Sequence, residues 1–400
     1  MNPGLASLQP YPFERLRSLL AGIEPTASPP IDFSIGEPRQ PAPGFIGENI
    51  IEHLHGLTEY PKVAGDLRLR EAVVQWAESR FSLPAGFLDP ERNVLPANGS
   101  REALFSIAQT VLDPCGERKN LVLMPNPFYQ IYEGAALLAG GEPYYLNCGP
   151  GGQPDFFRIP EGVLERCALL YINSPHNPTG ATLPLETLVY LLGLARKWNF
   201  VVASDECYSE IYFGSPPPGI LSAAARTGSM DQALAFQSLS KRSSIPGARS
   251  GFVAGDGTLL ASFLRYRTYL GAATPPFLQA AAREAWGDER HVERTRALYA
   301  EKFGLAEEIL GDLLPVAVPD GGFYLWLGVE DGERFTRSLY AAENVRCLPG
   351  AYLARMAHGE HPGQDRVRIA LVNDIETCRE GLLRIRNFLE TPSSTAPARR

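Results

Sequence analysis

Apolar and polar positions along the chain follow two periods, and each period predicts a different kind of element. Between residues 93 and 254, short apolar runs alternate with segments in which apolar residues recur every three or four positions. Unbroken apolar runs predict strands buried on both faces, and the segments between them predict helices. This alternation predicts an α/β fold with a mostly parallel, helix-covered sheet. The expected strands are 93–97, 121–124, 142–146, 168–172, 200–204, 233–237 and 251–254.

The two ends of the chain carry other patterns. Before the alternating region, helical spacing predicts helices at 12–23, 45–54 and 66–81, the last with Asp66 as N-cap. Residues 1–11 are expected to form an extended arm, and 31–35 a short strand. Beyond the alternating region we expect one long helical region at 277–314. Then follow strands at 316–318, 323–327, 345–348 and 367–371, with helices at 334–343 and 374–389.

A chain of 400 residues is too long for one small core and indicates two domains. We predict that residues 45–285 form the large domain and that 286–390 form a smaller α+β domain. Residues 1–44 are expected to supply an N-terminal arm and part of the small domain. The last ten residues, 391–400, read TPSSTAPARR and are expected to be disordered.

Composition narrows the class of protein. Apolar residues make up 44% of the chain and charged residues 20%, as in ordinary soluble enzymes, and the net charge of −8 argues against a nucleic-acid-binding protein. No stretch approaches the roughly 18 apolar residues of a membrane span, and no export signal is seen at the N-terminus. Six cysteines without CxxC spacing predict free thiols in a reducing cytoplasm and no metal site. His358 and His361 also lack metalloprotease spacing.

Candidate chemistry begins at Lys241, which lies in the stretch FQSLSKRSSIPGARSGF directly after an expected strand. A lone lysine in a serine-rich loop is usually just solvated. Three other motifs also follow expected strands: NGSREAL at 98–104, SPHNPTG at 174–180 and SDECY at 204–208. Ligands bind at the carboxyl ends of the strands in parallel sheets, so we expect these motifs to converge there.

The order and spacing of these motifs resemble the fold-type I aminotransferases of class I and II, which bind pyridoxal 5′-phosphate (PLP) on a lysine. The resemblance runs from about Ser34 to Leu389. Stretches outside the motifs, such as PYPFERLRSLLAG, PNPFYQIYEGAALLAGGEPYYLN and LPGAYLARMAHG, are similar to the enzymes of bacterial lysine biosynthesis that act on N-succinyl-L,L-2,6-diaminopimelate. The resemblance implies a transaminase (EC 2.6.1.17) that uses 2-oxoglutarate and forms N-succinyl-2-amino-6-oxopimelate and glutamate through pyridoxamine phosphate.

The resemblance also implies roles for single residues in binding the cofactor ring. Lys241 would carry PLP and move the substrate proton, and Asp205 would pair with the ring nitrogen. Tyr208 and Asn177 would bond to the ring 3′-oxygen, with Asn177 also bordering the substrate, and Tyr129 would stack on the ring. Taken alone, Asp205 also fits a turn cap and Tyr129 also fits the core.

A phosphate dianion needs backbone N–H groups, hydroxyls and an arginine. The resemblance supplies these from two places in the chain, around the start of a helix and around the lysine. It also implies a homodimer with shared active sites, because a tyrosine of the second subunit reaches the phosphate. The residues at these positions are Gly99, Ser100, Arg101, Ser238, Arg249 and, from the second subunit, Tyr60.

Substrate recognition requires a cation for the α-carboxylate. Arg368 matches the arginine that grips this group in the resembled family, although Arg366 lies on the same strand face and an arginine here is often a surface residue. Gly36 would offer a backbone N–H to the same carboxylate. A succinyl group adds a distal carboxylate, for which Arg39 and Lys62 are the candidate cations.

Two other functions stay open. One is another class I or II enzyme, an aminotransferase of the acetylornithine, aspartate, alanine or kynurenine type or a β-lyase, because the motifs alone do not separate them. His176, where glycine is expected, and the stretch GAATPP at 271–276 leave the acyl group undecided. The other is a non-catalytic PLP-binding regulator, which needs an added basic DNA-binding segment that the sequence does not show.

Overall fold

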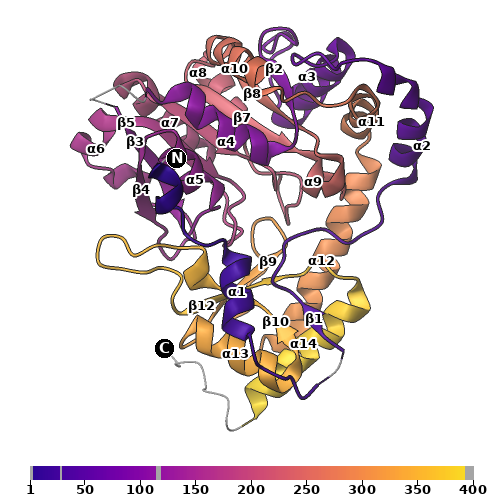
Figure 1. Ribbon diagram of the computed structural model, residues 1–400, viewed down its shortest axis with the longest axis vertical. Coiled ribbons are helices and arrows are strands. Elements are labelled where there is room, and N and C mark those ends of the chain that lie inside the picture. Colours follow the sequence, from indigo (N-terminus) through magenta and orange to yellow (C-terminus); the bar gives the residue numbers. More distant parts are fainter. Residues whose placement is uncertain (1–2, 28, 114–118, 392–400) are drawn as a thin grey trace.

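Seven strands form one central sheet, and four of its six pairings are parallel, so the α/β prediction is confirmed. The computed structural model describes residues 3–27, 29–113 and 119–391 (Figure 1). Strand β8 runs antiparallel to both of its neighbours, and the other pairs are parallel. The order is β2 (Val94–Ala97), β8 (Gly251–Gly255), β7 (Ala233–Ser238), β6 (Val201–Asp205), β5 (Cys167–Asn173), β3 (Leu121–Asn126) and β4 (Glu142–Asn147).

Helices cover both faces of this sheet. All residues of β3, β5, β6, β7 and β8 are buried, as unbroken apolar runs require. The apolar core on one face includes α3 (Leu67–Phe81), α7 (Leu185–Trp198), α8 (Ile220–Thr227) and α11 (Pro276–Gly287). The core on the other face includes α4 (Ser100–Val111), α5 (Ile131–Leu138) and α10 (Gly257–Leu270). Asp66 caps α3 as predicted, since its side chain accepts a hydrogen bond from the Arg68 backbone.

A second, smaller core lies below the central sheet in Figure 1. Its three-stranded antiparallel sheet has the order β11 (Leu348–Pro349), β12 (Arg366–Ala370) and β9 (Tyr324–Gly328). From the N-terminal part of the chain, β1 (Ile31–Asp32) also belongs to this part of the molecule, where it forms a separate two-stranded parallel sheet with β10 (Val345–Arg346). The helices of this part are α12 (Arg290–Leu310), α13 (Gly332–Glu343) and α14 (Ile375–Glu390). The predicted domain boundaries stay a prediction.

The N-terminal segment contacts both parts of the molecule. We expected an extended arm here, but the segment is not fully extended, because Pro3–Ser7 form a 3₁₀ turn that packs against α5. Helix α1 (Pro12–Leu20) then packs against α13 and β11. Residues 11–13 therefore lie between the two cores (Figure 1). Helix α2 (Gly44–Glu52) follows and packs against α11.

Three other expectations need correction or fall outside the described residues. The strand expected at 316–318 does not form, because Pro315 and Pro319 flank it and Val318 is exposed. The long helical region breaks at Asp288, whose carboxylate accepts from the backbone N–H of His291 in the next helix. The expected disordered tail lies outside the described residues from position 392 onward.

Three further properties concern the described part of the chain. None of its helices has the length and apolar character needed to cross a membrane. Its five cysteines are free thiols, and Cys115 lies outside it. Within the same residues, no cluster of three or more His, Cys, Asp or Glu side chains is arranged to hold a metal ion.

Candidate active site

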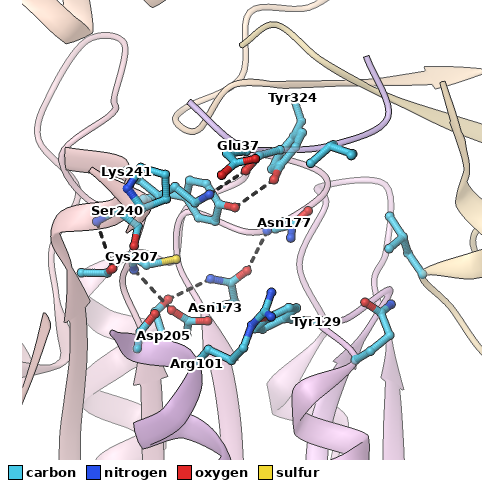
Figure 2. Close-up of a pocket in the computed structure, with 18 of the residues that line it drawn as sticks. Glu37, Arg101, Tyr129, Asn173, Asn177, Asp205, Cys207, Ser240, Lys241 and Tyr324 are labelled. Carbon is cyan, nitrogen blue, oxygen red and sulfur yellow. Dashed lines mark hydrogen bonds between the residues drawn. The ribbon is translucent and has the colours of Figure 1, made fainter. Parts of the chain in front are cut away.

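A cavity of about 440 Å³ lies where the central sheet meets the smaller core. The last residues of three neighbouring parallel strands line it: Asn173 of β5, Asp205 of β6 and Ser238 of β7. Tyr324 of β9 and Arg368 of β12 close the opposite side. The motifs therefore converge at the carboxyl ends of the strands, as the sequence predicts. Figure 2 shows the side chains that face this cavity.

Lys241 enters the cavity from the short helix α9 (Leu239–Arg242), which begins directly after β7. The Ser238 side chain caps this helix by accepting from the Ser240 backbone N–H at 3.1 Å. The Lys241 amine donates to the Gly36 carbonyl at 2.6 Å (Figure 2). Burial, with a contribution from Arg368, lowers the pKa of Lys241 to about 8. A substantial share of the amine is therefore neutral near pH 8 and able to act as a nucleophile.

Asp205 presents a buried carboxylate to the same cavity, with only 3% of its surface exposed. Its Oδ2 accepts from the Tyr132 hydroxyl at 2.6 Å, and its Oδ1 accepts from the Cys207 backbone N–H at 3.3 Å. Burial raises the pKa of Asp205, while the Tyr132 hydrogen bond lowers it. A carboxylate in this position suits a cationic partner inside the cavity.

An anion cradle lies at the start of α4. Gly99 is the N-cap of this helix with a positive φ of 79°, and a Cβ at this position would overlap the Arg249 guanidinium. Arg249 is fixed by hydrogen bonds to the carbonyls of Pro246 and Asn98, at 2.9 and 3.3 Å. Free N–H groups of a helix start beside a guanidinium fit a phosphate dianion. Ser100, Arg101 and Ser238 line the same cavity.

Aromatic side chains surround the space between the cradle and Lys241. Tyr129 lines the cavity, and its hydroxyl accepts from Arg101 Nε at 2.5 Å. Tyr208 and Tyr324 share a hydrogen bond of 2.9 Å between their hydroxyls (Figure 2). Asn177 also faces this space. The anion cradle, in which Gly99 leaves room for the Arg249 guanidinium, fits the phosphate of PLP. The aromatic side chains fit its ring, and Lys241 fits its aldehyde.

Arg368 is held in place by groups that leave part of its guanidinium open. It is 3% exposed, and its two terminal nitrogens donate to Asn177 Oδ1 at 3.0 Å and to the Ser34 carbonyl at 2.8 Å. Its buried Nε has no hydrogen-bond partner among the described residues. The guanidinium lies 4.3 Å from the ring centre of Tyr324. Such an orphaned donor suits a carboxylate ligand, whereas Arg366 is half-buried and lies outside this cavity.

Three of the residues named from the sequence do not line the cavity of this chain. The Tyr60 side chain is fully exposed, at 102%. Arg39 is exposed and donates to Asn373 Oδ1 at 2.6 Å, because the chain turns away from the cavity after Pro38. Lys62 is exposed as well. Neither candidate cation for a distal carboxylate is therefore placed in the cavity.

Several lining residues were not found from the sequence. Tyr324 is the clearest, since a Cβ at Gly36 would overlap its hydroxyl, and this pairing across 288 positions of chain left no local pattern. Asn173 could have been found, because it directly follows the expected strand 168–172 and is the last residue of β5. His176, the departure in SPHNPTG, is a buried residue whose ring bonds to Thr179 and to the Pro127 carbonyl. Burial lowers the pKa of His176 to about 4, so it is neutral and joins two loops.

A partly buried lysine and a buried carboxylate at the strand ends of this fold, beside an anion cradle, define a PLP-dependent enzyme of fold type I. The chain is matched over residues 28–385 by the family model described as aminotransferase class I and II. It therefore belongs to the class I and II aminotransferase family, whose members use PLP.

Individual relatives agree with this family. An LL-diaminopimelate aminotransferase from Aquifex aeolicus (strain VF5) is 32% identical over 368 residues, which cover 90% of this chain and 91% of the relative. The crystal structure of an aminotransferase from Neisseria meningitidis Z2491 has a TM-score of 0.93 and 45% identity, covering 97% of this chain and 100% of that one. A probable N-succinyldiaminopimelate aminotransferase from Thermus thermophilus has a TM-score of 0.83 and 27% identity, covering 94% of this chain and 99% of that one.

The lowered pKa of Lys241 predicts how cofactor capture depends on pH. Because only the neutral amine attacks the PLP aldehyde, the second-order rate of PLP binding to cofactor-free enzyme should rise with pH and reach half its plateau near pH 8. Stopped-flow absorbance measures this rate, with Nα-acetyl-lysine in solution as the control for the ionisation of PLP itself. A rate that keeps rising to pH 10, as for the free lysine, contradicts the assignment.

Proposed function

We propose that the cavity binds PLP through the residues named above and transfers an amino group at that site. Bound PLP supplies an electron sink for the substrate Cα. Lys241 takes the proton from Cα and returns it on the cofactor side, since its amine is the base that lines the cavity beside Asp205. Asp205 holds the ring nitrogen protonated, and Tyr208 and Asn177 hold the ring 3′-oxygen. The observation that carries this proposal is the convergence of Lys241, Asp205, Arg249 and Arg368 on one cavity.

The remaining cofactor contacts follow from position. We assign the phosphate to the backbone N–H groups of Gly99, Ser100 and Arg101 and to the side chains of Ser238 and Arg249. Helix α4 has 12 residues, so its partial positive charge also favours a dianion at its start. Tyr129 covers one face of the ring, because its side chain borders the same space from the loop before α5.

The substrate α-carboxylate is assigned to Arg368 and to the backbone N–H of Gly36. The open Nε of Arg368 and its rigid hold by Asn177 and Ser34 support a preorganised carboxylate site. Transamination between glutamate and a second amino acid requires both substrates to present this group in turn. A single fixed arginine meets that requirement.

We propose N-succinyl-L,L-2,6-diaminopimelate as the second amino acid and 2-oxoglutarate as its acceptor. The chain-wide resemblance and the name of the Thermus thermophilus structure support this choice. Arg101 also lines the cavity, and no hydrogen bond of its terminal nitrogens is found among the described residues, so a distal carboxylate has a cation to meet. Unacylated LL-diaminopimelate is the second candidate, because the Aquifex aeolicus relative is named for it and the Glu37 carboxylate lines the same cavity.

We also propose a homodimer in which Tyr60 of each subunit reaches the phosphate of the other site. A fully exposed tyrosine beside the exposed apolar residues Ile51 and Leu57 supports an interface at this surface. The large part of the chain would then be 45–285 and the small part 286–390 together with the N-terminal arm. The proposed compartment is the cytoplasm, since the described cysteines are free.

The substrate proposal predicts a ranking in a coupled assay. The PLP-loaded enzyme with 2-oxoglutarate should show a kcat/KM for N-succinyl-L,L-diaminopimelate about 10-fold or more above that for LL-diaminopimelate and N-acetylornithine, because an unmatched charge in a cavity costs about 1–3 kcal/mol. Glutamate release is the readout. Preference for the unacylated diamine would overturn the succinyl assignment and support the second candidate.

The dimer proposal predicts that a change at Tyr60, which lies outside the cavity of its own chain, weakens the binding of PLP. Tyr60→Phe removes one hydroxyl donor to a dianion, so PLP affinity should fall roughly 10-fold. Equilibrium dialysis measures the affinity, and sedimentation velocity should show that the variant is still a dimer. An active wild-type monomer, or unchanged PLP affinity in the variant, contradicts the shared site.

A further inference from the structure

Three donors reach the Asp205 carboxylate: the Tyr132 hydroxyl, and the backbone N–H and thiol of Cys207. Tyr132 lies in α5, in the first turn of the helix, and it is completely buried. Its hydroxyl donates to Asp205 Oδ2 at 2.6 Å, whereas the Cys207 backbone N–H lies 3.3 Å from Oδ1. The sequence gives no sign of this contact, because nothing local connects Tyr132 to a residue 73 positions further along the chain.

Two neighbouring aromatic rings fix the orientation of the Tyr132 side chain. The Tyr132 ring stacks on the Tyr171 ring, with 4.6 Å between the ring centres and 9° between the planes. The Tyr171 ring is itself held, because its hydroxyl donates to the Leu104 carbonyl at 2.6 Å. The edge of the Tyr132 ring meets Tyr129 at 5.7 Å and 86°. In a close-packed interior such a ring has no room to rotate. The hydroxyl is therefore held toward Asp205 whether or not a ligand is bound.

The charge state of the groups around Asp205 determines how they act on its carboxylate. The titratable groups that face Asp205 are Tyr129 and Tyr132 from the loop and helix α5, Tyr171 from β5, Cys207 from the loop after β6, and Lys241 from α9. Burial raises the pKa values of the three tyrosine hydroxyls and of the Cys207 thiol, so all four groups are neutral at pH 7. A neutral donor stabilises a carboxylate without cancelling its charge.

We propose that Tyr132 is a positioning residue that keeps Asp205 ionised and oriented, and thereby sets how firmly the protein holds the proton on the ring nitrogen of bound PLP. This inference rests on the proposed role of Asp205. Tyr132 keeps its own proton throughout. Loss of this hydrogen bond would make Asp205 more basic and weaken its hold on the proton at the ring nitrogen. The nitrogen of Lys241 that holds PLP would then be easier to protonate.

The test compares Tyr132→Phe with Tyr171→Phe in the PLP-loaded enzyme. Both variants remove a buried tyrosine hydroxyl from the same stacked pair, but only the first hydroxyl touches Asp205. The main readout is the pH midpoint of the visible absorption band of bound PLP, and kcat and KM are measured alongside. For Tyr132→Phe we expect a midpoint at higher pH and a kcat about 10-fold lower with KM changed little. For Tyr171→Phe we expect the wild-type midpoint.

Two further variants separate the possible failures. In an Asp205→Asn background, Tyr132→Phe should cause no additional change. If Asp205→Asn alone leaves the band unchanged, the proposed role of Asp205 is wrong; if it shifts the band but Tyr132→Phe does not, only the role of Tyr132 is wrong. Equal shifts in Tyr132→Phe and Tyr171→Phe also overturn the proposal. Should Tyr132→Phe fail to fold, 3-fluorotyrosine in place of Tyr132 supplies a stronger donor of nearly the same shape and should move the midpoint to lower pH. An unmoved midpoint there counts against the proposal.

Discussion

Burial of a carboxylate at the end of β6 is the constraint on which the rest of the site depends. An ionised Asp205 in a nearly dry environment is costly unless donors surround it, and the protein supplies the Tyr132 hydroxyl together with the backbone N–H and the thiol of Cys207. The carboxylate also lines the cavity. In the function we propose, a cationic ring nitrogen of PLP faces this carboxylate from the cavity. Lys241 is partly buried near the same point, and there desolvation favours the neutral amine that the chemistry needs.

The proposed cofactor and substrate contacts come from different parts of the chain. The ends of β5, β6 and β7 and the start of α4 line the cavity from the central sheet, whereas Arg368 belongs to the small antiparallel sheet. The two parts are joined near the loop before α5, which carries Tyr129. There Arg355 makes two hydrogen bonds to Glu133 of α5, at 2.6 and 2.9 Å, and the Phe128 backbone donates to the Leu353 carbonyl. This connection, in the stretch LPGAYLARMAHG, ties the smaller core to α5 and to the loop before it.

The sequence predicted what is local. Unbroken apolar runs identified the seven strands, because strands buried on both faces tolerate few polar residues, and the Asp66 cap followed from its position before a helical pattern. Polar residues at strand ends then identified Asp205 and Lys241 as cavity residues. Contacts between distant segments were not predictable in this way. Tyr132 beside Asp205, Tyr324 against Gly36 and the direction of Arg39 depend on how the layers pack, and the two prolines around 316–318 outweighed a β-branched pattern.

The central claim is that Lys241 carries PLP within reach of Asp205 and Arg249. The most direct measurement is borohydride reduction of the PLP-loaded enzyme, followed by digestion and mass spectrometry, because reduction fixes the cofactor to the amine that holds it. Our account expects the phosphopyridoxyl mass on the peptide that contains Lys241 and no label in Lys241→Ala. Label on another lysine, such as Lys119 or Lys302, or a protein that takes up no PLP, would contradict it.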